Sequence, residues 1–248
     1  MLATAPLNIT WEKLPDDYVL DDDPVDNINQ PALAAALTES LSLAGRLPET
    51  ALTTTNYGIC ATLNGKMVVK APDWAFVPSI TVPRIEIDRS YTPRLQGDLP
   101  AIVMEFLSET EGGEYSTKPT YPPGKWFFYE QILKVRYYAI FSLETGALEV
   151  YCLDQAGRYQ LCTPDTQGQY LIETMNLSLG PWQGVRDNRE GQWLRWWDEK
   201  GEMLLWSAER MTIERQRTEQ ERQRAEQECQ RADQLAAQLR AAGIEPES

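Results

Sequence analysis

Two acidic residues interrupt apolar segments that are typical of buried strands. Asp73 follows Pro72 and precedes the run Trp-Ala-Phe-Val, and Glu105 lies inside a run from about Ala101 to Leu107. A carboxylate in such a place costs free energy unless something pairs with it. Aspartate after proline is also common in turns, so Asp73 taken alone fits either a turn residue or a functional one.

A lysine downstream completes a recognisable chemical set. Mg²⁺ prefers oxygen ligands and is often held by one or two carboxylates together with waters and phosphate oxygens of the substrate. A lysine can hold an attacking water or stabilise negative charge on phosphorus. The lysine expected two residues after Glu105 is missing, because that position is Leu107. The lysine must therefore come from the next helix, where Lys125 lies one turn before Tyr129 on the same side. Asp73 and Glu105 are therefore the candidate metal ligands, and Lys125 is the third candidate catalytic residue.

The composition of the 248 residues excludes several classes of reaction. The chain has no histidine, which excludes serine and cysteine hydrolases that use an imidazole base and metal sites built on histidine. The net charge of −14 is unfavourable for an obligate nucleic-acid-binding protein, whose affinity comes largely from neutralising phosphates. The four cysteines have no C-x-x-C spacing, so we expect reduced thiols and neither a zinc site nor a disulfide framework.

The order of predicted elements is helix, several strands, helix, strands. Leucine and alanine spacing predicts a helix between Pro31 and Gly45. Asn64-Gly65 predicts a hairpin turn leading into the strand after Asp73. A strand over about 101–107 follows, then a helix behind Pro122 and Pro123, then three strands up to about residue 162. The tryptophan-rich segment beyond Leu171 predicts short strands that close one edge of the sheet, with its aromatic residues filling the core.

The C-terminal tail has a seven-residue repeat that begins at Glu214. The segments are ERQRTEQ, ERQRAEQ, ECQRADQ and LAAQLRA. Glu and Arg recur at spacings that support an isolated helix, so a single protruding helix and a coiled-coil homodimer both fit the pattern. The inward positions of the repeat become apolar only toward its end: Thr218, Arg222, Ala225, Cys229, Ala232, Ala236 and Leu239.

These features divide the chain into three parts. We expect an acidic N-terminal segment over 1–26, a core domain over 27–206 and a charged helical tail over 207–244. No segment approaches the roughly 20 apolar residues of a membrane-spanning helix, and the N-terminus lacks the pattern of a signal peptide. The expected location is the cytoplasm, without contact to a membrane.

Three segments together resemble the Uma-two family of putative restriction endonucleases, within the PD-(D/E)xK nuclease superfamily. They are APDWAFV, AIVMEFLSE and GKWFFYEQILKVRYYAIFSLETGALEVY, and the resemblance extends over about residues 15–200 and the tail. It implies an α/β fold with a restriction-endonuclease-like mixed sheet flanked by helices, and Mg²⁺ or Mn²⁺ held by Asp73 and Glu105. It also implies Lys125 as the displaced basic residue, with Lys118 as its rival. The family often carries an aspartate between the glutamate strand and the lysine helix, and here Glu114 stands in its place.

Two functions of different class follow. The first is a metal-dependent endonuclease that hydrolyses phosphodiester bonds of DNA. The alternative is a catalytically inactive scaffold with a nuclease fold that binds a protein partner through its C-terminal helix. Binding of Mn²⁺ between Asp73 and Glu105 discriminates between them, because a scaffold has no need of the metal.

Overall fold

A six-stranded mixed sheet forms the centre of the protein. The computed structural model describes residues 7–19, 28–107 and 113–241. The strand order is β2-β5-β6-β7-β8-β9, with β6 and β7 parallel and every other pair antiparallel. This arrangement confirms the predicted α/β fold with a mixed sheet. The strands are β2 (Leu52–Thr54), β5 (Trp74–Val77), β6 (Ile102–Leu107), β7 (Tyr137–Ser142), β8 (Leu148–Leu153) and β9 (Tyr159–Leu161).

A second, three-stranded sheet has the order β1-β3-β4 and contains the predicted hairpin. Its strands are β1 (Ile9–Thr10), β3 (Ile59–Leu63) and β4 (Lys66–Lys70). Asn64 and Gly65 join β3 to β4, and both have positive φ, at 50° and 75°. A two-residue turn of this kind matches the twist of antiparallel strands, so this local signal predicted the hairpin correctly. A 3₁₀ turn, Arg84–Glu86, lies in the connection between β5 and β6.

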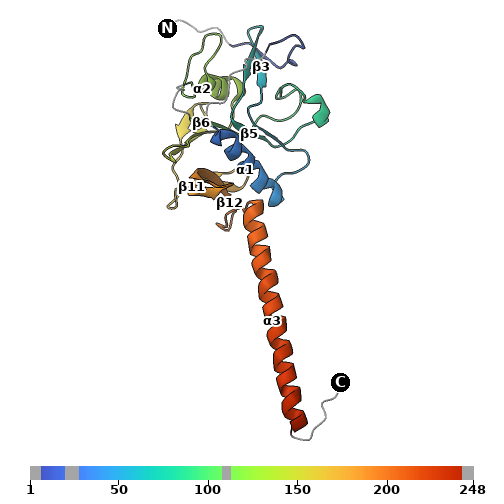
Figure 1. Cartoon of the computed structure of the whole chain (residues 1–248). Coiled ribbons are helices and arrows are strands. Elements are labelled where there is room, and N and C mark those ends of the chain that lie inside the picture. Colours follow the sequence, from blue (N-terminus) through green and yellow to red (C-terminus); the bar gives the residue numbers. More distant parts are fainter. Residues whose placement is uncertain (1–6, 20–27, 108–112, 242–248) are drawn as a thin grey trace. The chain divides into compact units, whose positions relative to one another are not determined.

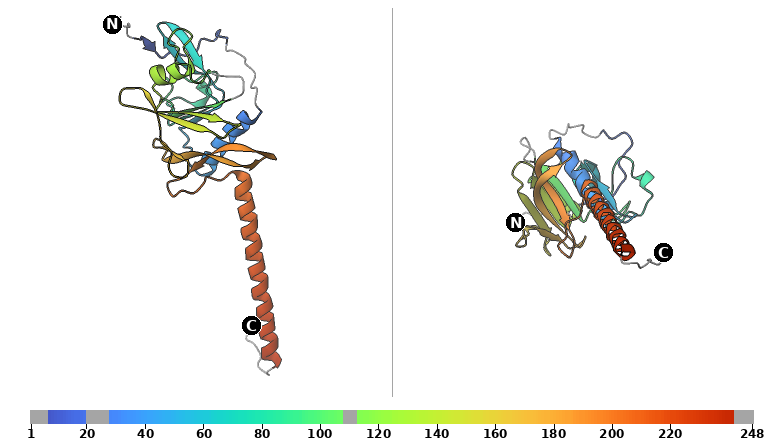
Figure 2. Two further views of the ribbon diagram at one scale, coloured as in Figure 1. Left: turned by 90° about the vertical axis from the view of Figure 1, so that its left-hand side faces the viewer. Right: turned by 60° about the horizontal axis from the view of Figure 1, so that its bottom comes forward.

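Helix α1 (Asn29–Leu43) lies between the six-stranded sheet and the hairpin formed by β11 (Leu177–Arg186) and β12 (Arg189–Trp197) (Figures 1 and 2). Gln30 Nε2 donates a hydrogen bond of 2.7 Å to the carbonyl oxygen of Phe106 in β6. Thr38 Oγ1 accepts one of 2.9 Å from the indole of Trp74 in β5. Apolar neighbours on both sides suit a helix rich in alanine and leucine, and its leucines at 33, 37 and 41 are fully buried.

The tryptophan-rich region folds differently from the prediction. Its strands β10 (Tyr170–Ile172), β11 (Leu177–Arg186) and β12 (Arg189–Trp197) form a sheet of their own, and do not close an edge of the central sheet. β11 and β12 pair over nearly their whole length, from Ser178–Trp197 to Arg186–Arg189. The expectation of an edge was wrong because the long hairpin satisfies its own hydrogen bonds and packs across α1. Its aromatic residues do fill the core, since Trp196 is buried against Trp74 with ring centroids 5.9 Å apart.

The predicted helix behind Pro122 and Pro123 is short and has two parts. A single α-turn, α2 (Lys125–Phe127), continues directly into a π-helical segment, η2 (Phe128–Leu133). The segment ends at Lys134, whose backbone is left-handed with φ 57° and ψ 47°. π-Helical turns are rare in proteins, and those that occur are often found at functional sites.

The C-terminal residues form a separate unit. The chain divides into two compact units, one up to Leu204 and one from Leu205 onward. Within the second unit, α3 (Ser207–Ala241) is one continuous helix (Figure 1). The Glu209 carboxylate accepts a hydrogen bond of 2.8 Å from the backbone N–H of Trp206 at the start of α3, as in a capping box. Among the described residues, no helix combines the length and the apolar character that crossing a bilayer requires.

Candidate active site

Asp73 and Glu105 are brought together by the ladder between β5 and β6. The register pairs Trp74 with Met104, so one step further along the ladder Asp73 lies opposite Glu105. Residues directly opposite in a ladder project to the same face of a sheet. The Asp73 carboxylate also accepts a hydrogen bond of 2.5 Å from the backbone N–H of Phe106. Asp73 is therefore fixed beside Glu105 at the C-terminal end of β6.

Two side chains from the short helix hold Glu105. Lys125 Nζ donates to one carboxylate oxygen of Glu105 at 3.1 Å, and the hydroxyl of Tyr129 donates to the other at 2.9 Å. The spacing of four residues places both side chains on the same side of the helix, as the sequence predicted. Glu105 is thus a buried carboxylate with a partner for each oxygen, which is what such a group requires in the core of a protein.

A third carboxylate comes from the loop before the helix. Glu114 Oε1 lies 3.5 Å from Lys125 Nζ, and the side chains of Lys125, Glu105 and Glu114 are 24%, 1% and 3% exposed. The hydroxyl of Tyr138 in β7 donates a hydrogen bond of 2.9 Å to the backbone carbonyl of Glu114 and fixes the loop there. The Lys125 ammonium therefore contacts carboxylates from two different elements.

Gly124 allows this loop to approach the helix. A Cβ at Gly124 would lie 2.1 Å from the carbonyl oxygen of Ser116. The Gly124 backbone N–H donates to the carbonyl of Lys118 at 3.0 Å, and the Phe127 N–H to that of Ser116 at 3.4 Å. The loop carbonyls thus satisfy N–H groups at the start of the helix that have no partner within it. Only glycine fits this position.

The surroundings of Glu105 set the charges of the site. Burial, with a contribution from the Asp73 carboxylate, raises the pKa of Glu105 to about 8, against the opposing effects of Lys125 and Tyr129. Burial lowers the pKa of Lys125, but the attraction of Glu105, Glu114 and Asp73 outweighs burial and raises it above its ordinary value. Burial and the neighbouring Glu105 raise the pKa of Tyr129. Tyr129 and Lys125 therefore act as hydrogen-bond donors, and Lys125 is the positive charge beside the acidic side chains of Asp73, Glu105 and Glu114.

The donor set fits a hard divalent cation. Asp73, Glu105 and Glu114 offer only carboxylate oxygens, and Glu114 Oε2 is buried without a hydrogen-bond partner. Over residues 7–19, 28–107 and 113–241 no group of three or more His, Cys, Asp and Glu side chains is close enough to hold a metal by itself. Mg²⁺ commonly uses one or two carboxylates and completes its shell with water and phosphate oxygens, and Asp73 with Glu105 meets that smaller requirement.

Other residues that the sequence singled out lie elsewhere. The rival Lys118 is exposed in the loop, and its backbone carbonyl is the part that contacts the helix. The serine of the AIVMEFLSE segment, Ser108, lies outside the described residues. The role of Tyr138 was missed, because a tyrosine in a strand gives no sign that its hydroxyl reaches a loop carbonyl distant in sequence.

Comparison with known proteins identifies one family. The family model Uma2, described as a putative restriction endonuclease, matches residues 30–185, more than half of the chain. The match extends from the first turn of α1 nearly to the end of β11 and includes every residue of the site described above. A search of curated proteins gave no match.

Proposed function

The chain belongs to the Uma2 family of putative restriction endonucleases, and we propose that it is a metal-dependent endonuclease of the PD-(D/E)xK type that cuts DNA. In this proposal Asp73 and Glu105 hold Mg²⁺ or Mn²⁺, and Lys125 is the catalytic lysine. When bound, such an ion supplies Lewis acidity toward a phosphate oxygen and lowers the pKa of a coordinated water.

The residues of the chain have separate tasks in hydrolysis. Lys125, held by Glu105 and Glu114, places a positive charge where negative charge develops on the phosphate in the transition state. Tyr129 keeps the Glu105 carboxylate in one orientation through its hydrogen bond. Glu114 has a buried oxygen without a partner, which is available to accept a proton or hydrogen bond from the attacking water. Phosphodiester hydrolysis then breaks the P–O bond to one deoxyribose oxygen, which takes up a proton from solvent, and water provides the new oxygen on phosphorus.

The observation that carries the proposal is the position of the Lys125 ammonium. Its Nζ lies 3.1 Å from Glu105 and 3.5 Å from Glu114, at the end of the ladder that also carries Asp73. A lysine at the first turn of a helix is unfavourable with respect to the helix dipole. The three carboxylates offset that cost, and a strand carboxylate pair with one lysine is the chemical set that phosphodiester cleavage with a metal needs.

The test combines metal binding with cleavage. Titration calorimetry with Mn²⁺ and cleavage of supercoiled plasmid and single-stranded DNA in Mg²⁺ are measured for wild type, Asp73→Asn, Glu105→Gln and Lys125→Met. We expect the two carboxamide variants to lose both Mn²⁺ binding and cleavage. Lys125→Met keeps Mn²⁺ binding and loses cleavage by at least about 100-fold, the typical cost of one group that stabilises transition-state charge.

Lys118→Met is the matched control, because Lys118 is an exposed lysine seven positions before Lys125 in the chain. Its cleavage rate should change by less than about tenfold, or about 1.4 kcal/mol in the barrier. A wild-type protein that neither binds Mn²⁺ nor cuts either DNA contradicts the proposal and favours the scaffold function. Cleavage that survives Lys125→Met but not Lys118→Met reverses the assignment of the lysine.

We also propose a cytoplasmic location. All four cysteines, Cys60, Cys152, Cys162 and Cys229, are free thiols. Unpaired cysteines are typical of proteins that work in a reducing compartment, where DNA is accessible to a nuclease. Fractionation of cells that express the tagged chain tests this location.

A further inference from the structure

A cavity lined by three basic residues lies at the opposite end of the central sheet from the candidate active site. Its volume is about 500 Å³. Residues on its wall include Pro78, which follows β5, residues 97–101, which precede β6, and Lys134 and Arg136, which precede β7. Glu105 lies four residues beyond Ala101 on β6, roughly 13 Å at the rise of a strand. The cavity is therefore separate from the carboxylate site.

The charge of the wall contrasts with that of the whole chain. The wall contains three basic residues, Arg94, Lys134 and Arg136, and one acidic residue, Asp98, whereas the whole chain carries a net charge of −14. Arg136 has protein partners, since it donates to the Leu153 carbonyl and lies 3.9 Å from Glu173. Among the residues that the structure describes, no carboxylate lies within ion-pair distance of Arg94 or Lys134. Two cations on a concave wall thus lack an anionic partner.

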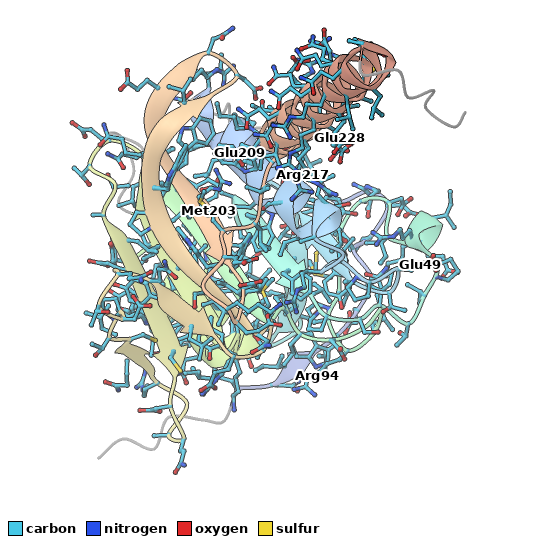
Figure 3. All side chains as sticks on the ribbon, turned by 90° about the horizontal axis from the view of Figure 1, so that it is seen from below. Glu49, Arg94, Met203, Glu209, Arg217 and Glu228 are labelled. Atoms are coloured by element: carbon cyan, nitrogen blue, oxygen red, sulfur yellow. The ribbon has the colours of Figure 1, made fainter. Side chains whose placement is uncertain are left out.

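The backbone at these two residues is unusual. Arg94 and Lys134 both have positive φ, at 66° and 57°, a conformation that glycine adopts at lower cost. A long basic side chain in this conformation carries a backbone cost, and residues held in such conformations cluster at functional sites. Arg94 lies with its guanidinium 5.6 Å from the centre of the Trp11 ring, and Figure 3 shows it at the outside of its unit. The Trp11 ring thus holds the Arg94 side chain in one orientation, and Arg94 remains exposed to solvent.

We propose that this cavity binds the phosphate groups of a small phosphorylated molecule. Guanidinium and ammonium groups are the side chains that recognise phosphate most strongly. Leu99, Pro100 and Ala101 supply an apolar part of the wall, which suits the body of such a ligand, and the volume lies in the range of small-molecule sites. The proposal is independent of the nuclease activity, because it uses none of the residues of the carboxylate site.

Inorganic pyrophosphate and ADP are the probes. Binding is measured by titration calorimetry without added metal on the full chain and on Arg94→Gln/Lys134→Gln, which removes two charges and keeps side chains of similar length. The matched control is Lys13→Gln/Lys200→Gln, because both lysines are exposed and outside the cavity. We expect both probes to bind wild type and the control alike, with affinity for the cavity variant at least about tenfold lower, as for lost charge-assisted hydrogen bonds.

Several results would overturn this assignment. One is that neither pyrophosphate nor ADP binds wild type at millimolar concentration. Another is that the cavity variant and the control variant lose affinity equally, and a third is that the affinity of the cavity variant is unchanged. Lys134 also lies at the C-terminal end of a helix, where a cation is favourable without any ligand. Thermal unfolding of the cavity variant separates these roles: a helix-capping role alone lowers stability and leaves phosphate affinity unchanged, which contradicts the proposal.

Discussion

At the scale of single residues, Glu105 has the most demanding environment in the candidate site. It is fully buried, and each of its oxygens depends on one donor, Tyr129 or Lys125. Such a group is tolerated only while its partners are present, because an unsatisfied buried polar atom costs more free energy than a hydrogen bond contributes. The geometry of the site is therefore sensitive to small changes in Tyr129.

The variant Tyr129→Phe tests this dependence. It leaves one Glu105 oxygen buried without a donor, so we expect the free energy of unfolding to fall by about 1–3 kcal/mol in the absence of metal. Urea denaturation followed by tryptophan fluorescence measures the change. Glu105→Leu also removes the partner of Lys125, so the control is a double-mutant cycle: Tyr129→Phe should destabilise the Glu105→Leu background less than it destabilises wild type. An equal effect of Tyr129→Phe in both backgrounds would show that the hydroxyl stabilises the fold through some other contact.

At the scale of elements, the short helix from Lys125 to Leu133 and the loop before it act as one positioning unit. The loop carbonyls of Ser116 and Lys118 accept the N–H groups at the helix start, and the loop supplies Glu114 to the site. Gly124 makes the contact possible, since a Cβ there would overlap a backbone atom, which cannot rotate away.

Gly124→Ala should therefore separate the loop from the helix. Insertion of a methyl group at 2.1 Å from a carbonyl oxygen is expected to destabilise the protein by roughly 1–3 kcal/mol, as overpacking does. Cleavage activity should fall as well, because Glu114 and Lys125 are displaced. Gly113→Ala is the control in the same loop: a Cβ at Gly113 meets nothing within 4 Å. Its free energy of unfolding should change by less than about 0.5 kcal/mol, and an equal effect of both changes would contradict the proposed role of the contact.

The other end of the same helical segment is tied to the β8–β9 turn by Glu130. Its carboxylate accepts hydrogen bonds from the backbone N–H of Tyr159 at 2.8 Å and from Arg158 at 2.9 Å. Burial raises the pKa of Glu130, but these bonds and those from Gln131 and Trp126 outweigh burial and lower it below its ordinary value of 4.5. A carboxyl group whose pKa is lowered by folding stabilises the folded state above its unfolded pKa, and this contribution disappears as the pH falls through the folded pKa.

The variant Glu130→Gln should therefore have a lower free energy of unfolding than wild type, mainly at neutral pH. We expect a loss of about 1–3 kcal/mol at pH 7, the range for hydrogen bonds to a charged group. The difference from wild type should begin to shrink below about pH 4.5, where Glu130 of the unfolded chain becomes protonated, and should disappear once the pH falls below the lower pKa of Glu130 in the folded protein. Urea denaturation at a series of pH values measures it, with exposed Glu144→Gln as the control. A difference that stays constant down to pH 3 would contradict this origin of the effect.

At the scale of the whole molecule, local signals predicted more of the structure than long-range ones. The turn at Asn64 and Gly65 and the helix from Asn29 to Leu43 follow from neighbours in the sequence. The π-helical segment and the independent sheet of β11 and β12 depend on packing between distant segments. The same holds for the candidate site: Asp73 and Glu105 could be singled out from the sequence because a carboxylate in a buried strand is conspicuous, and their catalytic role stays a prediction. The hydrogen bond from Tyr138 to the Glu114 carbonyl could not be predicted, because it depends on where a loop crosses the sheet.

The boundary between core and tail stays a prediction that truncation can test. The side chains of α3 from Arg210 onward are largely exposed, so little apolar surface is uncovered when they are removed. A chain ending at Ala208 keeps the buried Trp206 and should unfold cooperatively at the same temperature as the full chain, as followed by circular dichroism. A broad transition, or a midpoint lowered by more than about 5 °C, would show that the core needs the tail, since a shift of that size corresponds to about 1–2 kcal/mol in a domain of this size.

The homodimer through α3 is the last prediction, and Cys229 makes it testable. Arg222 forms ion pairs with Glu219 and Glu226 within one helix, which supports a single helix as well as a coiled coil. In a parallel coiled coil with Ala225, Cys229 and Ala232 at inward positions, each Cys229 faces its copy across the seam. Mild oxidation with glutathione disulfide should then give a disulfide-linked dimer of the full chain, and Cys229→Ser should abolish it. Sedimentation velocity under reducing conditions should show the same dimer without the disulfide. The control for crosslinking is the variant Arg215→Cys/Cys229→Ser, which moves the exposed cysteine to position 215. If the protein sediments as a monomer and Cys229 crosslinks no more than this control, α3 is a solitary helix that is stabilised by its own ion pairs.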